Sequence, residues 1–382
     1  MAKDICIIMP TIREFQSLKA YYANARQHGF DVSRIHTLIM TEDFCDKQAM
    51  LKMFADEGVS GEVFNEVDRR AWLKEHGLES LGDVIPRKTH AEISTGLLYM
   101  WVHKNFKYGV FIDDDTVPFP QHDYFGTHVA NLEYKGPIKA VSSDKKWVNT
   151  LHQNFSRHKL YPRGYPYSAM KEVVSVRDGT ATNVVLSQGL WTNIPDLDSI
   201  RILMDGDLNG QAKTLTHETD FKGNFIPDKG NYITSCTMNL AFKREIIPIF
   251  YQIPMDENPW KIGRFQDIWS GVFLKRAADV MGHQVITGYP LCIHNKAPRN
   301  TFRDVNLETP ALNLNEHLWS IVENAEIRGQ SYAELYPQFA RAIAEHKNEY
   351  HNNEFLKFMA EKMLKWTQCL DILDRKKIAV PA

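Results

Sequence analysis

The chain has 382 residues, of which 43% are hydrophobic, and it carries 45 basic against 47 acidic residues. That length suits one large domain with an appendage, or two domains, with ample hydrophobic content for a core. The balanced charge gives no argument for nucleic-acid binding, and no run of about 18 apolar residues predicts a membrane span. The five cysteines lack CxxC spacing and no secretory signal is recognisable, which is typical of reduced thiols in a cytoplasmic protein.

The N-terminal part alternates between strand-like and helix-like segments. Residues 5–9, closed by Pro10, predict a strand, residues 15–27 a helix, and residues 36–40 a second strand. This order favours parallel pairing. No GxGxxG follows the first strand, which argues against a dinucleotide-binding fold for NAD or FAD. We therefore expect a nucleotide-binding type of sheet without a redox cofactor.

The next segment, residues 63–81, is polar and predicts no clear element. Arg87 and Lys88 then precede a helix whose apolar residues recur at helical spacing from Ile93 to Trp101. Free backbone N–H groups at the start of a helix attract phosphate, so these basic residues suit phosphate binding. A solvated basic turn fits the spacing equally well.

The most informative stretch is an apolar run at residues 108–112 that leads directly into Asp113, Asp114 and Asp115. Such a run predicts a buried strand with the carboxylates at its C-terminal end, the edge at which open α/β sheets bind ligands. In an extended chain Asp113 and Asp115 point the same way. Two such carboxylates suit Mg²⁺ or Mn²⁺ shared with a diphosphate, whereas a solvated acidic turn is the alternative.

From residue 136 to 187 the pattern breaks into short, mixed segments. One of them, residues 161–167 (YPRGYPY), places Arg163 among prolines, a glycine and tyrosines. A rigid aromatic frame around an arginine suits the recognition of a diphosphate or carboxylate. The alternative is a purely structural arginine that stacks on the tyrosines.

Residues 188–198 look rich in turns and include Trp191, Asn193 and Asp196. Amide and carboxylate groups beside one aromatic face suit a sugar, and they also suit ordinary turns. Residues 205–230 are expected to form a loop.

The last part of the sheet should comprise strands at residues 231–242 and 285–293, with a helix ending near residue 281 between them. Asp267, near the start of this helix, fits either a helix cap or a carboxylate that faces a sugar. His294 follows the last strand and could complete a metal site with Asp113 and Asp115. From about residue 316 to 373 the chain is helical, with an apolar stripe that predicts packing.

Taken together, these segments resemble the reversibly glycosylated polypeptides, a family that includes the plant UDP-arabinopyranose mutases. Seven motifs keep the family's order across about four-fifths of the chain. They are residues 9–13 (MPTIR), 111–115 (FIDDD), 163–168 (RGYPYS), 190–196 (LWTNIPD), 238–242 (MNLAF), 263–271 (GRFQDIWSG) and 294–297 (HNKA).

The resemblance implies an α/β, GT-A-like (Rossmann-like) nucleotide-diphosphosugar fold, with a mixed, mainly parallel sheet and a C-terminal helical region. The catalytic domain would span residues 1–300 and a helical extension residues 301–382. The resemblance also implies roles for single residues, as follows. Asp113, Asp115 and His294 would hold Mn²⁺ (or Mg²⁺); Thr11, Arg13, Lys88, Asp114, Trp191, Asn193 and Asp196 would bind the nucleotide sugar; Arg163 and Asp267 would be catalytic.

The implied activity is a metal-dependent, non-redox UDP-sugar mutase that interconverts pyranose and furanose forms, with arabinose as the expected sugar. The family has a second aspartate where this chain has Gln266, and an arginine where it has Lys171. These differences keep two alternatives open. One is a glycosyltransferase acting on a glycan, protein or modified nucleic acid; the other is a non-catalytic UDP-sugar-binding subunit in a homo- or hetero-oligomer.

Overall fold

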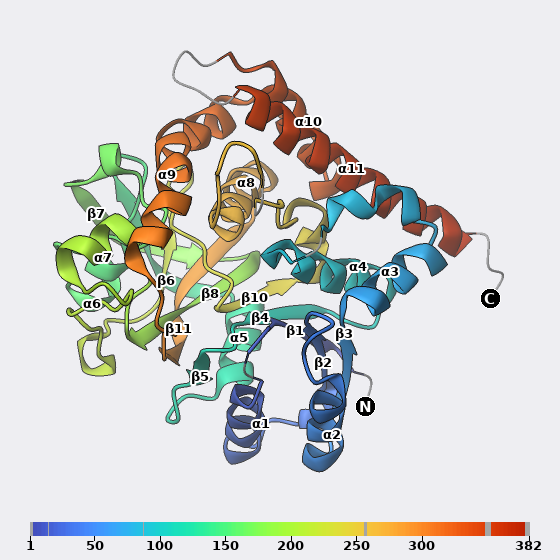
Figure 1. Ribbon diagram of the computed structural model, residues 1–382. Helices are drawn as coiled ribbons and strands as arrows, with labels where there is room; N and C mark the ends of the chain where they lie inside the picture. Colours follow the sequence, from blue (N-terminus) through green and yellow to red (C-terminus); the bar gives the residue numbers. More distant parts are fainter. Residues whose placement is uncertain (1–2, 14, 87, 256–257, 348–352, 379–382) are drawn as a thin grey trace.

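The structure is a computed structural model that describes residues 3–13, 15–86, 88–255, 258–347 and 353–378 (Figure 1). Its centre is one 11-stranded sheet. Along the main path the strands follow the order β3-β2-β1-β4-β10-β8-β11-β9-β6-β7, and β5 pairs with β11.

The first half of the chain forms a parallel unit. Its elements are β1 (Ile5–Pro10), α1 (Ser17–Gln27), β2 (Ile35–Met40), α2 (Lys47–Glu57), β3 (Ser60–Phe64), α3 (Glu66–Glu75), α4 (Ser94–Val102) and β4 (Tyr108–Ile112). β1 lies between β2 and β4, with Ile5 opposite both Ile35 and Tyr108. The predicted parallel pairing is therefore present.

The second half completes the sheet and covers it. Its elements up to the last strand are β5 (Thr116–Pro118), α5 (Tyr124–Glu133), β6 (Gly136–Ser143), α6 (Thr150–Phe155), β7 (Val174–Ala181), β8 (Val184–Asn193), α7 (Ser199–Asp205), β9 (Phe225–Pro227), β10 (Asn239–Lys243), α8 (Gln266–Met281) and β11 (Gln284–His294). β10 runs antiparallel to both β4 and β8, and β11 runs parallel to β8. Consequently β1, β2, β4, β8 and β11 all end at the same edge of the sheet.

Both faces of the sheet are covered by helices because successive residues of its strands point to opposite sides. Ile5 and Ile7 of β1 belong to a hydrophobic cluster with α1, α2 and α5. Cys6 and Ile8 belong to a larger cluster with α4, α8 and the C-terminal helices. Figure 1 shows α1 and α2 on one side of the sheet and α4, α10 and α11 on the other. The fold is thus a three-layer α/β arrangement.

Three helices, α9 (Thr301–Asn324), α10 (Tyr332–Glu345) and α11 (Asn353–Ile378), form the C-terminal region. They cross the upper side of the molecule in Figure 1 and share the larger hydrophobic cluster with the sheet. α9 starts fifteen residues before the helical segment expected from residue 316. The apolar pattern did not predict the first part of α9 because two of its buried residues are acidic: Asp304 is 5% exposed and Glu308 1%. The division of the chain at residue 300 stays a prediction.

The predicted class, α/β with a mixed, mainly parallel sheet and a helical C-terminal region, is confirmed, and the cysteines are free. The expectation that residues 188–198 are rich in turns is wrong. Most of these residues belong to the buried strand β8. The polar residues of this strand are satisfied inside the protein: the Gln188 amide donates to the carbonyls of Cys236 and Asn239. Residues 231–238 precede β10 and are not part of it.

Two further elements were not expected in the polar stretch 63–81. β3 ends there, and α3 begins at a capping box in which Asn65 and Asp68 each accept a hydrogen bond from the other's backbone N–H.

In the part of the chain that the structure describes, no helix is both long and apolar enough to cross a membrane.

Replacing Trp366 by alanine tests whether the C-terminal helices are integral to the fold. Trp366 is fully buried, stacks on Tyr251 with ring centroids 4.9 Å apart, and donates to the Pro248 carbonyl at 3.1 Å. We expect Trp366→Ala to lower the free energy of unfolding by about 3–5 kcal/mol in a single denaturant transition.

Leu364→Ala is the matched control, because Leu364 lies on the same helix but is 36% exposed. It should cost less than about 1 kcal/mol. If Trp366→Ala instead splits the transition in two, with the first step alone affected, the helices unfold independently and this expectation is wrong.

Candidate functional site

A cavity of about 730 Å³ opens at the edge where the central strands end. Its walls are the segments that follow β1, β2, β4, β8 and β11, together with the start of α9. Nine of the residues singled out from the sequence line it: Thr11, Arg13, Lys88, Asp113, Asp114, Asp115, Arg163, Asp196 and His294. The topology therefore brings together residues that are up to 283 positions apart (294 − 11).

Asp114 is held by the segment that follows β1. Its carboxylate accepts hydrogen bonds from the Thr11 hydroxyl and from the Arg13 guanidinium, both at 2.7 Å. Asp114 is 8% exposed, whereas the Arg13 side chain is 50% exposed. Asp114 thus fixes the loop after β1 and keeps Arg13 at the cavity wall.

Asp113 and Asp115 lie next to this pair without comparable partners. The Oδ1 atom of Asp113 is buried and accepts no hydrogen bond. Burial raises the pKa of Asp113 well above its usual range, and Asp115 and Asp114 raise it further. A carboxylate in this setting favours a cation beside it.

His294 faces the same carboxylates. Its Nδ1 lies 2.8 Å from the Ile194 carbonyl, which can only accept, so Nδ1 carries the hydrogen and Nε2 has a free lone pair. Nε2 lies 3.9 Å from Asp115 Oδ2. Burial lowers the pKa of His294 although Asp115 opposes this, so the ring is neutral at pH 7. No three His, Cys, Asp or Glu side chains among the described residues are already arranged to hold a metal ion.

Arg163 is the centre of a buried ionic network. Its Nε lies 2.9 Å from Asp196 Oδ2, and its terminal nitrogen lies 2.9 Å from Asp267 Oδ2. Burial alone would lower the pKa of the guanidinium, but Asp196 and Asp267 more than offset it and hold that pKa well above the usual value. Burial would raise the pKa of Asp196, yet Arg163 keeps it below its ordinary value. Arg163 is therefore a permanent cation that two carboxylates hold in place.

The backbone around Arg163 is positioned by helices α8 and α9. Gly164 has a φ of +86°, and a Cβ at this position would lie 2.6 Å from Ile268 of α8. The Gly164 carbonyl accepts from Asn315, and Glu316 accepts from the backbone N–H of Tyr167 at 2.6 Å. Only glycine allows this approach, and α9 fastens the loop from the other side.

The tyrosines that flank Arg163 in the sequence frame a different arginine. Arg201 of α7 lies 5.0 Å from the ring centre of Tyr161 and 4.9 Å from that of Tyr167. The expected aromatic frame thus exists, but its arginine comes from another segment, because sequence neighbours on an irregular loop need not face each other.

Asp267 does not line the cavity. It lies in the first turn of α8, is 5% exposed, and directs both carboxylate oxygens at Arg163. Trp191 and Asn193 do not line it either. Trp191 is 2% exposed within a hydrophobic cluster, and the Asn193 amide donates to the His294 carbonyl at 3.0 Å.

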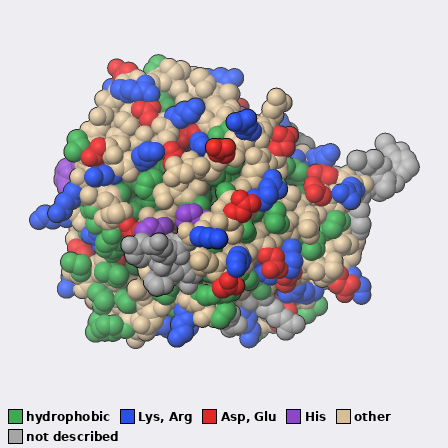
Figure 2. Space-filling model, turned by 90° about the horizontal axis from the view of Figure 1, so that it is seen from above, with side chains coloured by type: hydrophobic (Ala, Val, Ile, Leu, Met, Phe, Trp, Pro, Cys, Tyr) green, Lys and Arg blue, Asp and Glu red, His purple; other side chains and the backbone are tan. Residues whose placement is uncertain are grey.

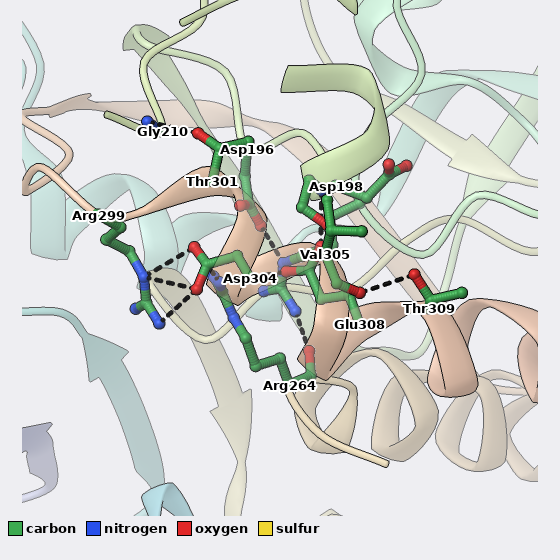
Figure 3. A network of polar contacts seen from close by, with 12 residues as sticks. Asp196, Asp198, Gly210, Arg264, Arg299, Thr301, Asp304, Val305, Glu308 and Thr309 are labelled. Carbon is green, nitrogen blue, oxygen red and sulfur yellow. Dashed lines mark hydrogen bonds and ion pairs between the residues drawn. The ribbon is translucent and has the colours of Figure 1, made fainter. Parts of the chain in front are cut away.

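A second ionic network, which the sequence did not indicate as a unit, adjoins Arg163 (Figure 3). The carbonyl of Arg264 accepts from Arg163, and the Arg264 side chain lies 2.7 Å from Asp304 and 3.3 Å from Glu308. Arg299 pairs with Asp304 from the other side at 3.0 Å. Arg264 belongs to the motif at residues 263–271 and Arg299 follows the motif at residues 294–297 by two positions, and this was the only signal for either residue.

A third network closes the side of the cavity near β2. Arg69 contacts Glu42 at 3.2 Å and Glu92 at 3.1 Å, and all three side chains are about 5% exposed or less. Glu42 also accepts from the backbone N–H of Lys88, whose φ is +50°. Nothing in the polar stretch around Arg69 pointed to this role. Arg87 lies outside the described residues.

Acidic and basic side chains alternate over the face shown in Figure 2, without a continuous region of one sign. The net charge of −2 agrees with this distribution.

A covered α/β sheet whose strand ends surround a cavity of clustered carboxylates and arginines is the arrangement of α/β enzymes that bind their ligand at the carboxyl ends of the strands. The chain belongs to the reversibly glycosylated polypeptide family, whose sequence profile matches residues 2–374.

Similar proteins carry related names. The chain is 26% identical over 388 residues to "Probable UDP-arabinopyranose mutase 1" of Pisum sativum, covering 98% of this chain and 92% of that one. It is 25% identical over 384 residues to "UDP-arabinopyranose mutase 2" of Arabidopsis thaliana, covering 97% and 92%. A solved glucosyl-3-phosphoglycerate synthase from Mycobacterium tuberculosis is 11% identical over 82% of this chain and 78% of that one, and its TM-score of 0.39 is too low for any conclusion.

Proposed function

We propose that the chain is a UDP-sugar mutase that interconverts the pyranose and furanose forms of its sugar, with UDP-arabinopyranose as the expected substrate. The observation that carries this proposal is Arg163, a permanent cation on the cavity wall between Asp196 and Asp267. The family membership and the names of its relatives point to the same activity.

The chemistry of ring exchange fits these residues. The bond between C1 and the diphosphate breaks, another sugar hydroxyl closes the new ring, and the diphosphate attaches again at C1. No electrons are transferred, so no flavin or nicotinamide is needed. Negative charge develops on the departing diphosphate, and a preorganised cation such as Arg163 stabilises it. Because Arg163 stays protonated, it acts as an electrostatic clamp and not as a nucleophile.

The remaining roles follow from position. Thr11, Arg13 and Lys88, which line the side of the cavity near β1 and β2, would bind the nucleotide with Asp114. Asp196 lines the cavity and would meet the sugar, while Asp267 acts through Arg163 and positions it.

A divalent cation fits the donor set beside these residues. Asp113 offers a buried oxygen without a hydrogen bond, and His294 offers an Nε2 lone pair 3.9 Å from Asp115. A site made of carboxylates and an imidazole suits Mn²⁺. The carboxylates alone would also suit Mg²⁺. Asp113, Asp115 and His294 would therefore hold the ion, which when bound would neutralise charge on the diphosphate.

A glycosyltransferase is the second candidate, favoured by Gln266. This residue stands beside Asp267 where the resemblance led us to expect a further carboxylate, and its side-chain oxygen is buried without a hydrogen bond. The loss of one carboxylate near the sugar would reduce the activity of a mutase more than that of an enzyme that transfers the sugar to an acceptor.

The test is incubation of the protein with Mn²⁺ and single UDP-sugars, without acceptor, followed by chromatography. UDP-arabinopyranose, UDP-glucose, UDP-galactose and UDP-xylose form the panel. We expect a new peak of unchanged mass from UDP-arabinopyranose alone. Slow release of free UDP without such a peak would contradict the mutase and favour the transferase, while binding of UDP without any turnover would favour a non-catalytic subunit.

A further inference from the structure

Lys296 is a cation of the cavity that the proposed function has not used. It lies between β11 and α9, and its side chain lines the cavity. The backbone on both sides is fixed: the Asn295 N–H donates to the Asp115 carbonyl at 2.8 Å, and the Lys296 carbonyl accepts from Gln211 at 3.1 Å. The position of Lys296 relative to Asp115 is therefore set by the fold.

Most cations around the cavity are already neutralised by carboxylates of the protein. Arg163 has Asp196 and Asp267, Arg13 has Asp114, Arg264 has Asp304 and Glu308, and Arg299 has Asp304. Each of these arginines, Arg163 included, shares its positive charge with at least one carboxylate of the protein. A diphosphate carries several negative charges, so a cation without an ion pair of its own would add to the stabilisation that Arg163 provides.

Lys296 meets that requirement. Within the described ranges, its ammonium has no carboxylate within 4.0 Å and no hydrogen-bond partner. The side chain is partly buried, and burial of an ammonium without a partner is costly unless an anion joins it. Lys88 and Arg303 also line the cavity without an ion pair, but both are exposed, so water already solvates their charges.

We propose that Lys296 Nζ is a catalytic group that binds the terminal (β) phosphate of the nucleoside diphosphate, an inference that rests on the proposed function. When the bond from sugar C1 to the β-phosphate oxygen breaks, its electron pair stays on that oxygen. Lys296 donates hydrogen bonds to the β-phosphate and stabilises the added charge without losing a proton. When the sugar has changed its ring, the same oxygen attacks C1 and the charge is removed again.

The experiment compares wild type with Lys296→Met and Lys296→Arg by calorimetric titration with UDP, UMP and uridine, all at the same Mn²⁺ concentration. Met keeps an unbranched side chain that is one atom shorter, and it removes the charge. We expect Lys296→Met to weaken UDP binding by about 10- to 100-fold, because a hydrogen bond to a charged group is lost. UMP, which lacks the β-phosphate, and uridine should bind within about twofold of wild type, and Lys296→Arg should recover most of the UDP affinity.

Lys104→Met is the matched control, since it removes one lysine charge from an exposed loop at the opposite end of β4. Thermal unfolding of each variant shows that the fold is kept. Unchanged UDP affinity in Lys296→Met overturns the inference, and an equal loss for UDP and UMP overturns the assignment to the β-phosphate. If wild type itself binds neither UDP nor UMP, the proposed function fails and this inference fails with it.

Discussion

Arg163→Ala is expected to reduce turnover by at least about 100-fold, the effect of removing one preorganised electrostatic stabiliser of the transition state. It should also lower the free energy of unfolding by about 3–5 kcal/mol, because Asp196 and Asp267 would remain buried without their shared cation. Single-turnover kinetics with UDP-arabinopyranose and denaturant unfolding measure the two effects separately.

Two further variants separate catalysis from stability. The double variant Arg163→Gln with Asp267→Asn should recover part of the stability, since fewer unpaired charges stay buried, but none of the turnover. Arg201→Ala removes the arginine that lies between Tyr161 and Tyr167, outside the cavity lining, and should affect stability without changing UDP affinity. Wild-type turnover in Arg163→Ala would show that Arg163 is structural only.

Joint replacement of Asp113 and Asp115 by asparagine is expected to abolish Mn²⁺-dependent UDP binding. In wild type, UDP with Mn²⁺ at 100 times the dissociation constant should add about 2.7 kcal/mol of stability, and the double variant should show no such gain. Without metal the variant should be as stable as wild type or more stable, because Asp113 is a buried carboxylate without a hydrogen bond to Oδ1 and next to two like charges. Thermal unfolding with and without UDP and Mn²⁺ measures both effects.

The neighbouring carboxylate should behave differently. Asp114→Asn weakens two hydrogen bonds of 2.7 Å and should destabilise the protein even without metal. Asp178→Asn is the control, because that carboxylate is 92% exposed and pairs only with Lys139 on the surface. A Mn²⁺-dependent UDP shift that survives in the Asp113/Asp115 double variant would refute the metal assignment.

Local sequence patterns were sufficient to predict the central parallel strands of the sheet and one edge of the site. The apolar runs at residues 5–9, 36–40 and 108–112 predicted β1, β2 and β4, because buried parallel strands need continuous apolar residues. The carboxylates that follow β4 then had to lie at the strand ends, where the cavity is found.

The same local reasoning missed elements whose buried faces are polar. β8 contains Gln188, which satisfies its amide inside the protein, and α9 turns Asp304 and Glu308 inward to Arg264. In both cases the partner lies far away in the chain, so no local pattern could show that a polar residue was buried.

The sequence by itself therefore determined the class of fold, the strand ends at which ligands meet the protein, and the identity of Asp113, Asp115, Arg163 and His294 as candidates. Only the tertiary structure decided how these groups are paired. It placed Asp267 behind Arg163, framed Arg201 and not Arg163 with tyrosines, and left Lys296 without an ion pair among the described residues. The physical reason is that charge pairing depends on distances between side chains from separate segments, and those distances exist only once the sheet and α9 have packed together.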